Sequence, residues 1–187
     1  MALRFCPTTK FKSGQSNPTY LIKAKSGRYV LRAKPPGQLL KSAHQVDREF
    51  RVISALAATD VPVAPARLLC DDDAVIGSMF YVMEFKEGRI LWDPALPDMD
   101  NAGRARVYDE MNRVIAALHT VDFAARGLAD FGKPGNYFGR QVDRWTKQYK
   151  LSETEHMPEM ERLIEWLPQT IPPQHGSSVV HGDYRLD

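Results

Sequence analysis

The feature that most constrains this fold is a change of hydrophobic pattern near residue 86. Before it, short runs rich in β-branched and aromatic residues are separated by turn residues, a pattern typical of an antiparallel sheet. After it, apolar residues recur at helical spacing over long stretches. Strands followed by helices indicate the α+β class. We therefore expect a small sheet-bearing lobe over residues 1–86 and a mainly helical lobe over residues 87–187.

Five strands and one helix are expected in the first lobe. The strands are predicted at residues 10–12, 19–24, 28–32, 66–70 and 79–85. Ser26-Gly27 is a tight turn, so the second and third strands form a hairpin. The last run is apolar on both faces, which predicts a central place in the sheet. Between the third and fourth strands, residues 42–58 carry a helical apolar stripe of Val46, Phe50, Ile53 and Ala57.

Three helices and a late strand are expected in the second lobe. Asp100 is a candidate N-cap for a helix whose buried face carries Val107, Met111, Val114 and Leu118. Further helices are predicted over residues 137–150 and 158–167. The β-branched run at 177–180 predicts a short strand that leads into His181-Gly182-Asp183.

Composition excludes several classes of protein. The 187 residues are 43% hydrophobic and 26% charged, so the chain can bury a core and is not disordered. A net charge of +2 without basic runs argues against nucleic-acid binding. No apolar stretch approaches the roughly 20 residues that span a membrane, and no signal peptide is visible. Cys6 and Cys70 have no metal-binding spacing and fit free thiols. We expect a cytoplasmic protein.

Three features of the first lobe suit the binding of a phosphorylated ligand. The small polar turn over residues 13–17 would let backbone N–H groups approach phosphate, although an ordinary hairpin loop fits it as well. Glu49 lies in or beside the apolar stripe of its helix, where a carboxylate needs a cationic partner. Arg32, on the preceding strand, is the expected partner. A surface ion pair is the alternative reading of the two.

The tripeptide His181-Gly182-Asp183 is the sharpest chemical signal. In kinase-type catalytic loops the Asp of H-x-D takes the proton of the substrate hydroxyl, and an Asn five residues later binds Mg²⁺. H-x-D alone is common by chance. That Asn would be residue 188, so we expect the sequence to stop inside the catalytic loop, with no metal ligand within this chain.

Three other patterns are predicted to carry no chemistry. Asp130-Phe131-Gly132 spells a kinase metal motif but precedes H-x-D instead of following it, so a turn is expected there. Residues 127–133 resemble a P-loop, but Pro134 stands where a Mg²⁺-binding hydroxyl is required. The acidic run at 71–73 is expected to be a solvated turn.

Taken in order, these motifs resemble the aminoglycoside phosphotransferase and choline kinase-like superfamily. The resemblance rests on residues 14–20, 29–32, 47–50, 81–85, 87–89 and 181–187. Within the superfamily the chain is most similar to the kinase-like domains of acyl-CoA dehydrogenase family proteins and to their free-standing bacterial relatives, on residues 32–37, 88–92 and 140–149. It implies a protein-kinase-like fold with an incomplete helical lobe.

The resemblance also implies residue roles. The nucleotide would be held by Gly14, Gln15, Ser16, Asn17, Arg32, Glu49, Met83, Glu84, Phe85 and Lys86. Arg32 stands where relatives carry Lys, with Lys34 as the other candidate cation. Met83 would border the adenine pocket, and the backbone of residues 84–86 would pair with the base. Asp183 would be the catalytic base. Candidate substrate contacts on the helical lobe, where helix packing is the plainer alternative, are Tyr137, Arg140, Arg144 and Trp145.

The implied reaction is transfer of the γ-phosphoryl group of ATP, with Mg²⁺, to an alcohol of a small molecule. A hydroxyacyl-CoA is the leading acceptor, because basic residues on the predicted helix over 137–150 suit an anionic substrate. Aminoglycoside or choline-type acceptors are less expected. The alternative is a non-catalytic nucleotide-binding pseudokinase or scaffold module. We expect the isolated chain to be inactive, and neither nucleic acid nor membrane to be a partner. The oligomeric state is left open.

Overall fold

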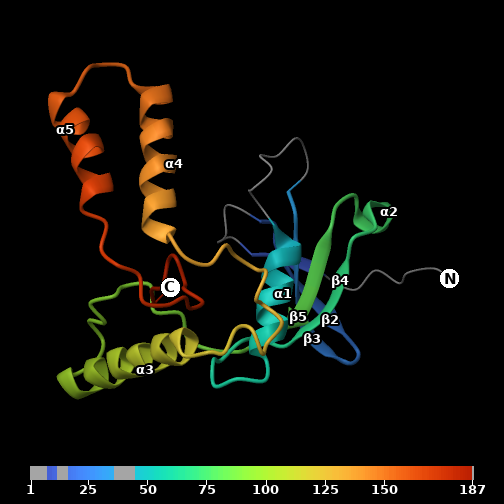
Figure 1. The fold of residues 1–187 in the computed structure, drawn as a ribbon. Helices are drawn as coiled ribbons and strands as arrows, with labels where there is room; N and C mark the ends of the chain where they lie inside the picture. Colours follow the sequence, from blue (N-terminus) through green and yellow to red (C-terminus); the bar gives the residue numbers. More distant parts are fainter. Residues whose placement is uncertain (1–7, 12–16, 36–44, 187) are drawn as a thin grey trace.

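The computed structural model describes residues 8–11, 17–35 and 45–186. Their strands form one five-stranded antiparallel sheet, as predicted, in the order β1-β2-β3-β5-β4 (Figure 1). The strands are β1 (Thr8–Lys10), β2 (Thr19–Ala24), β3 (Gly27–Ala33), β4 (Ala66–Cys70) and β5 (Phe80–Glu84).

The central place predicted for the fifth strand is confirmed. β5 lies between β3 and β4, and its Phe80 and Tyr81 are buried. The predicted hairpin is present, but its two turn residues are Lys25 and Ser26, one position earlier than expected. Gly27 opens β3 opposite Ala24 with φ of 144°, a backbone conformation that side chains rarely adopt. The apolar run and the turn residue therefore place β2, β3 and β5 side by side.

Helix α1 (Val46–Leu56) packs on β4 and β5. Val46 is fully buried, and Leu56 is nearly so. Ala57, predicted on the buried stripe, is instead exposed, because the helix ends there and Ala57 is its C-cap. A second, short helix, α2 (Asp73–Ile76), begins at the last residue of the acidic run, where the Asp72 side chain accepts the N–H of Ala74.

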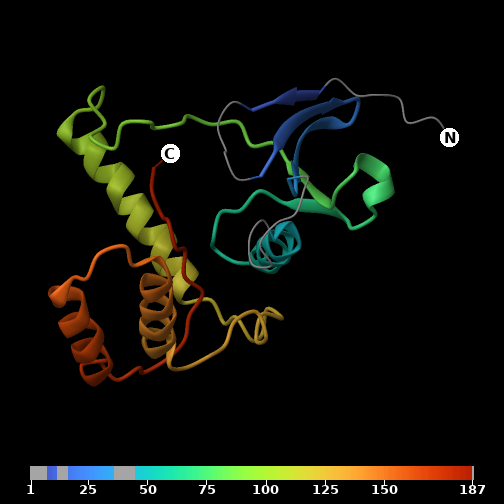
Figure 2. The ribbon, with the colours of Figure 1, turned by 90° about the horizontal axis from the view of Figure 1, so that it is seen from above.

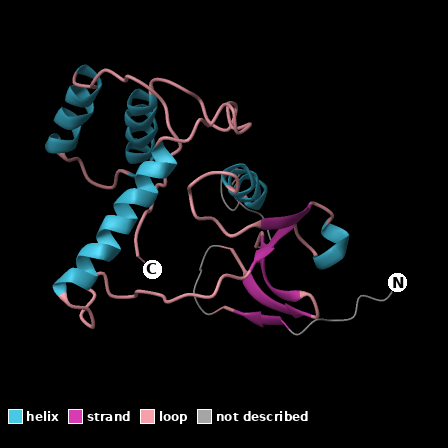
Figure 3. Cartoon of the chain, turned by 90° about the horizontal axis from the view of Figure 1, so that it is seen from below, coloured by secondary structure: helices cyan, strands magenta, loops and turns pink. Residues whose placement is uncertain are grey.

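The helical part begins with α3 (Asn101–His119). The predicted cap is confirmed, since the Asp100 carboxylate accepts the N–H of Gly103 at 2.6 Å. It continues with α4 (Tyr137–Ser152), α5 (Pro158–Trp166) and the short 3-10 helix η1 (Leu167–Gln169). Seen along a second direction, α1 lies between the sheet and these helices (Figures 2 and 3).

A small apolar cluster joins the two parts of the chain. The cluster contains three buried residues: Leu56 of α1, Val61 in the segment after α1, and Leu118 of α3. Val179, from the C-terminal segment, packs against them. The cluster therefore connects the helix that covers the sheet to the segment that carries His181-Gly182-Asp183.

The strand predicted at 177–180 is wrong. This segment has no regular secondary structure, because none of the described strands runs beside it to supply ladder hydrogen bonds. Packing of Val179 positions it instead. Among the residues that the structure describes, no helix is long and apolar enough to cross a lipid bilayer.

Candidate active site

Glu49 is the centre of a polar cluster between α1 and the sheet. Its Oε2 accepts Nε–H of Arg32 at 2.7 Å, and its Oε1 lies 3.4 Å from Nη2 of the same guanidinium. Oε1 also accepts the side-chain amide of Asn17 at 3.0 Å, and Oε2 accepts the hydroxyl of Tyr81 at 3.2 Å. One carboxylate thus joins three parts of the first lobe: the segment that leads into β2, strand β3 and strand β5.

The sheet register explains why these side chains meet. Arg32 lies opposite Tyr81 in the β3–β5 pair and opposite Thr19 in the β2–β3 pair, so all three project from the same face. That face is covered by α1, where Phe50 contacts the Tyr81 ring at 6.2 Å between centroids. Glu49 precedes Phe50 and reaches the same surface. The sequence prediction that Glu49 needs a cation is therefore met by Arg32.

The residues around this carboxylate differ in how deeply they are buried. Asn17 is 3% exposed and Tyr81 is 2% exposed, whereas about a third of the Arg32 and Glu49 side chains remains accessible. Burial, and next the negative charge of Glu49, raises the pKa of the Tyr81 hydroxyl, which therefore stays protonated and donates. The inner side of the cluster, Asn17 and Tyr81, is therefore buried, whereas the guanidinium of Arg32 remains accessible to solutes.

The segment expected to meet the nucleotide base follows β5. The backbone N–H of Glu84 is donated to the carbonyl of Pro65 and that of Phe85 to the carbonyl of Arg28. Arg28 also lies over the Phe85 ring at 4.7 Å. Glu84 forms ion pairs with Lys86 and Arg67, whose hydrogen bonds lower the pKa of its carboxyl. Met83 precedes this segment on the face that Tyr81 shares.

Asp183 lies in an exposed turn beside α3. Its backbone N–H is donated to Nδ1 of His181 at 3.2 Å, and its carboxylate lies 3.9 Å from Nε of Arg185. The next residue, Tyr184, donates its hydroxyl to the carbonyl of Met111 at 3.1 Å and packs edge-on against His181. These contacts fix the backbone around Asp183 and leave 76% of its side chain accessible.

An open cavity of about 690 Å³ lies next to this turn. Tyr184 forms one side of it, and α3 and the residues before it form the rest. Its lining mixes apolar side chains with both charges: Arg89, Asp98, Met99, Asp100, Gly103, Arg106, Val107, Glu110, Met111 and Val114.

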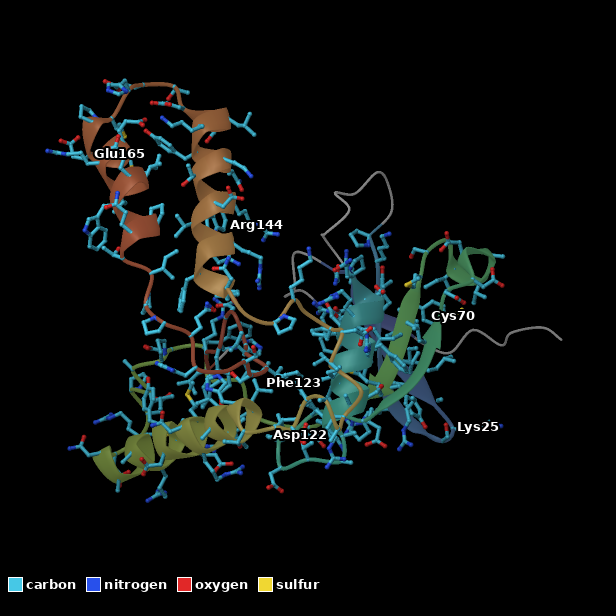
Figure 4. All side chains as sticks on the ribbon, viewed as in Figure 1. Lys25, Cys70, Asp122, Phe123, Arg144 and Glu165 are labelled. Carbon is cyan, nitrogen blue, oxygen red and sulfur yellow. The ribbon has the colours of Figure 1, made fainter. Side chains whose placement is uncertain are left out.

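The four candidate substrate residues all lie on α4, away from that lining. Arg140 is engaged locally, because its guanidinium donates to the carbonyls of Gly135 and Lys133. Trp145 and Tyr137 are more than half exposed. Figure 4 shows Arg144 projecting from the side of α4 that faces away from α5. The structure thus does not bring these residues to the cavity beside Tyr184, and their substrate role stays a prediction.

Gly14, Gln15 and Ser16 lie outside the described residues. Among the residues that are described, Glu153, His156 and Glu161 offer potential metal-ligand atoms within 4.8 Å of one another. The ammonium group of Lys150 already pairs with both glutamates there, which leaves a divalent ion little unmet negative charge.

Two contacts of the cluster were missed by sequence reasoning. The Tyr81 hydroxyl could have been suspected, because an alternating strand over 79–85 places it on the face of Met83. Asn17 was assigned to phosphate through its loop, and its bond to a glutamate 32 residues away has no local signal. The cluster as built can position one cation, Arg32.

A family model described as the phosphotransferase enzyme family, APH, matches residues 7–187. The chain belongs to this family. Mouse acyl-CoA dehydrogenase family member 10 is 49% identical over 178 residues, which cover 95% of this chain and 17% of that protein. Human acyl-CoA dehydrogenase family member 11 is 41% identical over 179 residues, covering 95% and 23%. The chain therefore spans less than a quarter of the length of these relatives.

A solved structure agrees with this assignment. The crystal structure of a candidate aminoglycoside phosphotransferase from Ralstonia eutropha superposes with a TM-score of 0.86 at 56% identity, over 100% of this chain and 54% of that one. The kinase-like α+β fold expected from the sequence is confirmed. The superfamily and subgroup resemblances are confirmed as well.

Proposed function

We propose that this phosphotransferase chain binds ATP and belongs to an enzyme that transfers the γ-phosphoryl group to an alcohol of a small molecule. The observation that carries the proposal is the Arg32–Glu49 pair with its buried supports, Asn17 and Tyr81. In this proposal residues 1–86 bind the nucleotide and residues 87–187 contribute Asp183 and the acceptor side.

We also retain a cytoplasmic location as a proposal, because few and widely spaced cysteines fit a reducing compartment.

Arg32 is suited to hold phosphate oxygens. Glu49 takes its Nε–H and one N–H of Nη2, and Thr19 lies at 3.5 Å from Nη1. A guanidinium has five N–H groups, so further donors are left for an anion. Phosphoryl transfer depends on positioning and on neutralising charge more than on covalent chemistry, and a held guanidinium provides both. Bound Mg²⁺ would neutralise further phosphate charge.

The segment after β5 is proposed to hold the base. The amides of Glu84 and Phe85 are engaged within the sheet, so the amide of Lys86, for which the described part of the chain provides no acceptor, is the donor left for the base edge. Met83 would border the base on the α1-covered face of the sheet. The ion pairs of Glu84 with Lys86 and Arg67 hold this segment in place.

Asp183 is proposed as the group that orients the acceptor hydroxyl and takes its proton. It is accessible, and its backbone is fixed by the bond to His181. A carboxylate in this role needs hydrogen-bond reach to the hydroxyl, which an exposed side chain on a fixed backbone can provide.

A hydroxyacyl-CoA remains our proposed acceptor. The cavity beside Tyr184 combines apolar side chains such as Val107 and Met111 with Arg89 and Arg106, a mixture suited to an amphiphilic anion. The relatives named acyl-CoA dehydrogenase family members support an acyl thioester context. The alternative is a nucleotide-binding module without turnover.

Calorimetric titration of the chain with Mg·ATP tests the nucleotide part. We expect Arg32→Gln to weaken binding about tenfold or more, the loss of one hydrogen bond to a charged group. The matched control is Arg162→Gln on α5, whose guanidinium pairs with Glu159 at 3.0 Å, far from the cluster. Equal affinities of both variants and wild type would exclude Arg32 from the site.

The transfer step is tested in the full gene product with a hydroxyacyl-CoA and an aminoglycoside as competing acceptors. We expect phosphorylation of the hydroxyacyl-CoA, and Asp183→Asn should abolish it while leaving the Mg·ATP affinity nearly unchanged. Phosphorylation of the aminoglycoside alone would refute the acceptor assignment. Binding without transfer to any alcohol would favour the non-catalytic module.

A further inference from the structure

The Asp130-Phe131-Gly132 triplet, which resembles a metal motif, lies in a turn as predicted, but this turn binds α1. Arg48 of α1 donates to the carbonyl of Phe131 at 2.6 Å and lies over the Phe131 ring at 4.0 Å. Arg51, one helical turn on, donates to the carbonyl of Gly127 at 2.6 Å and forms an ion pair with Asp130. We call residues 123–132 the docking turn; it lies beside α1 in Figure 1.

The docking turn is built to present these groups. Leu128 is 2% exposed and anchors it, and its N–H is donated to the carbonyl of Phe123 at 2.8 Å. Gly127 has φ of 72°, in the left-handed region that favours glycine, so the chain can reverse there. The N–H of Phe131 is donated back to the carbonyl of Leu128. Figure 4 labels Asp122 and Phe123, where the turn leaves α3.

The docking turn and the polar cluster are linked through α1, which carries Arg48, Arg51 and Glu49. Arg48 and Arg51 are three residues apart and share one face of the helix, whereas Glu49, one residue after Arg48, projects about 100° away. The helix is therefore held from two sides: Glu49 binds the sheet, and the two arginines bind the segment after α3. A shift of α1 along or about its axis would move Glu49 relative to Arg32.

We propose that Asp130 and Phe131 are positioning residues that fix α1 through Arg51 and Arg48, and thereby set the Glu49–Arg32 pair. The docking turn couples the helical part of the chain to the phosphate-binding cation. The nucleotide consequence rests on the proposed function, but the placement of α1 does not. The Arg51–Asp130 ion pair is largely exposed and contributes little. The bonds to the carbonyls of Phe131 and Gly127 and the contact with the Phe131 ring therefore hold α1 more strongly.

The test uses the Arg48→Gln/Arg51→Gln double variant of the whole chain, with Arg162→Gln as a matched loss of an ion-paired arginine. Hydrogen exchange of the α1 amides reports helix placement, with β3 and β5 as internal references for global stability. We expect α1 amides to exchange about tenfold faster or more, as for loss of one charge-assisted hydrogen bond, while β3 and β5 keep their protection. Unchanged α1 exchange would overturn the proposal.

Mg·ATP affinity then separates positioning from plain stability. If α1 occupies its binding-competent place only part of the time, the apparent Kd rises by the inverse of that fraction, about three- to tenfold for a fraction of a third to a tenth. The swapped pair Arg51→Asp/Asp130→Arg should recover a small part of the α1 protection and of the Mg·ATP affinity that Arg51→Asp alone loses, because the exposed ion pair contributes less than the carbonyl contacts. Faster α1 exchange with wild-type affinity would refute the positioning role.

Failure of the two proposals can be distinguished. If wild-type chain binds no Mg·ATP, the proposed function fails, and the exchange of α1 still decides whether the docking turn holds the helix. If the double variant does not fold, Arg51→Lys replaces it, because a lysine keeps the charge but cannot bind the Gly127 carbonyl and Asp130 with a planar fork. Wild-type exchange and affinity in Arg51→Lys would overturn the proposal.

Discussion

Replacing Glu49 by Gln should destabilise the chain far more than its partial exposure suggests. The carboxylate accepts donors from Arg32, Asn17 and Tyr81 within 3.2 Å. A glutamine keeps one acceptor oxygen and places an amide N–H₂ where the other stood. One of these donors then faces another donor, and the bond to Arg32 loses its charge assistance.

The expected size follows from these contacts. Hydrogen bonds to charged groups contribute about 1.5–3 kcal/mol and neutral ones about 1 kcal/mol, so the loss at Arg32 is about 1 kcal/mol. The mismatched donor adds a cost of about 1–3 kcal/mol if it is buried, as the donors of Asn17 and Tyr81 are. Water reaches about a third of the Glu49 side chain, so we expect roughly 2 kcal/mol in all. For a chain of this length, that lowers Tm by about 4–8 °C.

The assay is urea and thermal unfolding of Glu49→Gln, Arg32→Gln and the double variant, with Glu159→Gln as the control. Glu159 also pairs with an arginine, but both side chains are more than 70% exposed, so its change should stay within about 0.5 kcal/mol. The double-mutant cycle should give a coupling of about 1–2 kcal/mol between positions 32 and 49. Additive effects within about 0.3 kcal/mol would refute the view that these two residues act as a unit.

Two further outcomes concern burial. Because burial raises the pKa of Tyr81, its hydroxyl stays neutral in the folded state at a pH where an unfolded tyrosine ionises, so the stability of the chain should fall as pH rises above about 10. The urea midpoint should fall less steeply across this range in Tyr81→Phe than in wild type, whereas the control Tyr137→Phe, at an exposed position, should follow wild type. Equal slopes for Tyr81→Phe and wild type would contradict this prediction. Leu118→Ala should lower the free energy of unfolding by about 2–4 kcal/mol, measured by thermal or urea unfolding, because Leu118 is 7% exposed in the cluster that joins α1 to α3. The control Leu151→Ala, at a position that is 90% exposed, should change the free energy of unfolding little. Equal losses in the two variants would contradict the role of the cluster.

Local periodicity was sufficient for most of the fold. The strand pattern over 79–85 predicted both β5 and its central position, and Asp100 marked the start of α3. The segment at 177–180 shows where the pattern fails: β-branched residues favour extended backbone, but a strand also needs a partner. Its Val179 finds apolar neighbours instead, which a one-dimensional pattern cannot show.

Long-range contacts explain what the sequence did not reveal about the candidate site. Glu49 could be matched to Arg32 because a carboxylate in an apolar stripe demands a cation, and the preceding strand offered one. Arg140 is a candidate substrate contact through the family resemblance, and in the structure the carbonyls of a preceding loop engage its guanidinium. Charge alone does not tell whether an arginine binds a ligand or its own backbone, because both offer the same kind of acceptor.

The arginine at position 32 makes structural sense once its neighbours are known. A lysine ammonium held by Glu49 would be a single charged point shared between carboxylate and phosphate. Arg32 instead meets Glu49 with Nε and Nη2 along one edge and keeps N–H groups on Nη1 and Nη2 for another anion. Such a fork acts only at a fixed angle, so the carboxylate must be held rigidly. Asn17, Tyr81 and the docking turn behind α1 each restrict Glu49, and their number is explained if its orientation, more than its charge alone, is what the site requires.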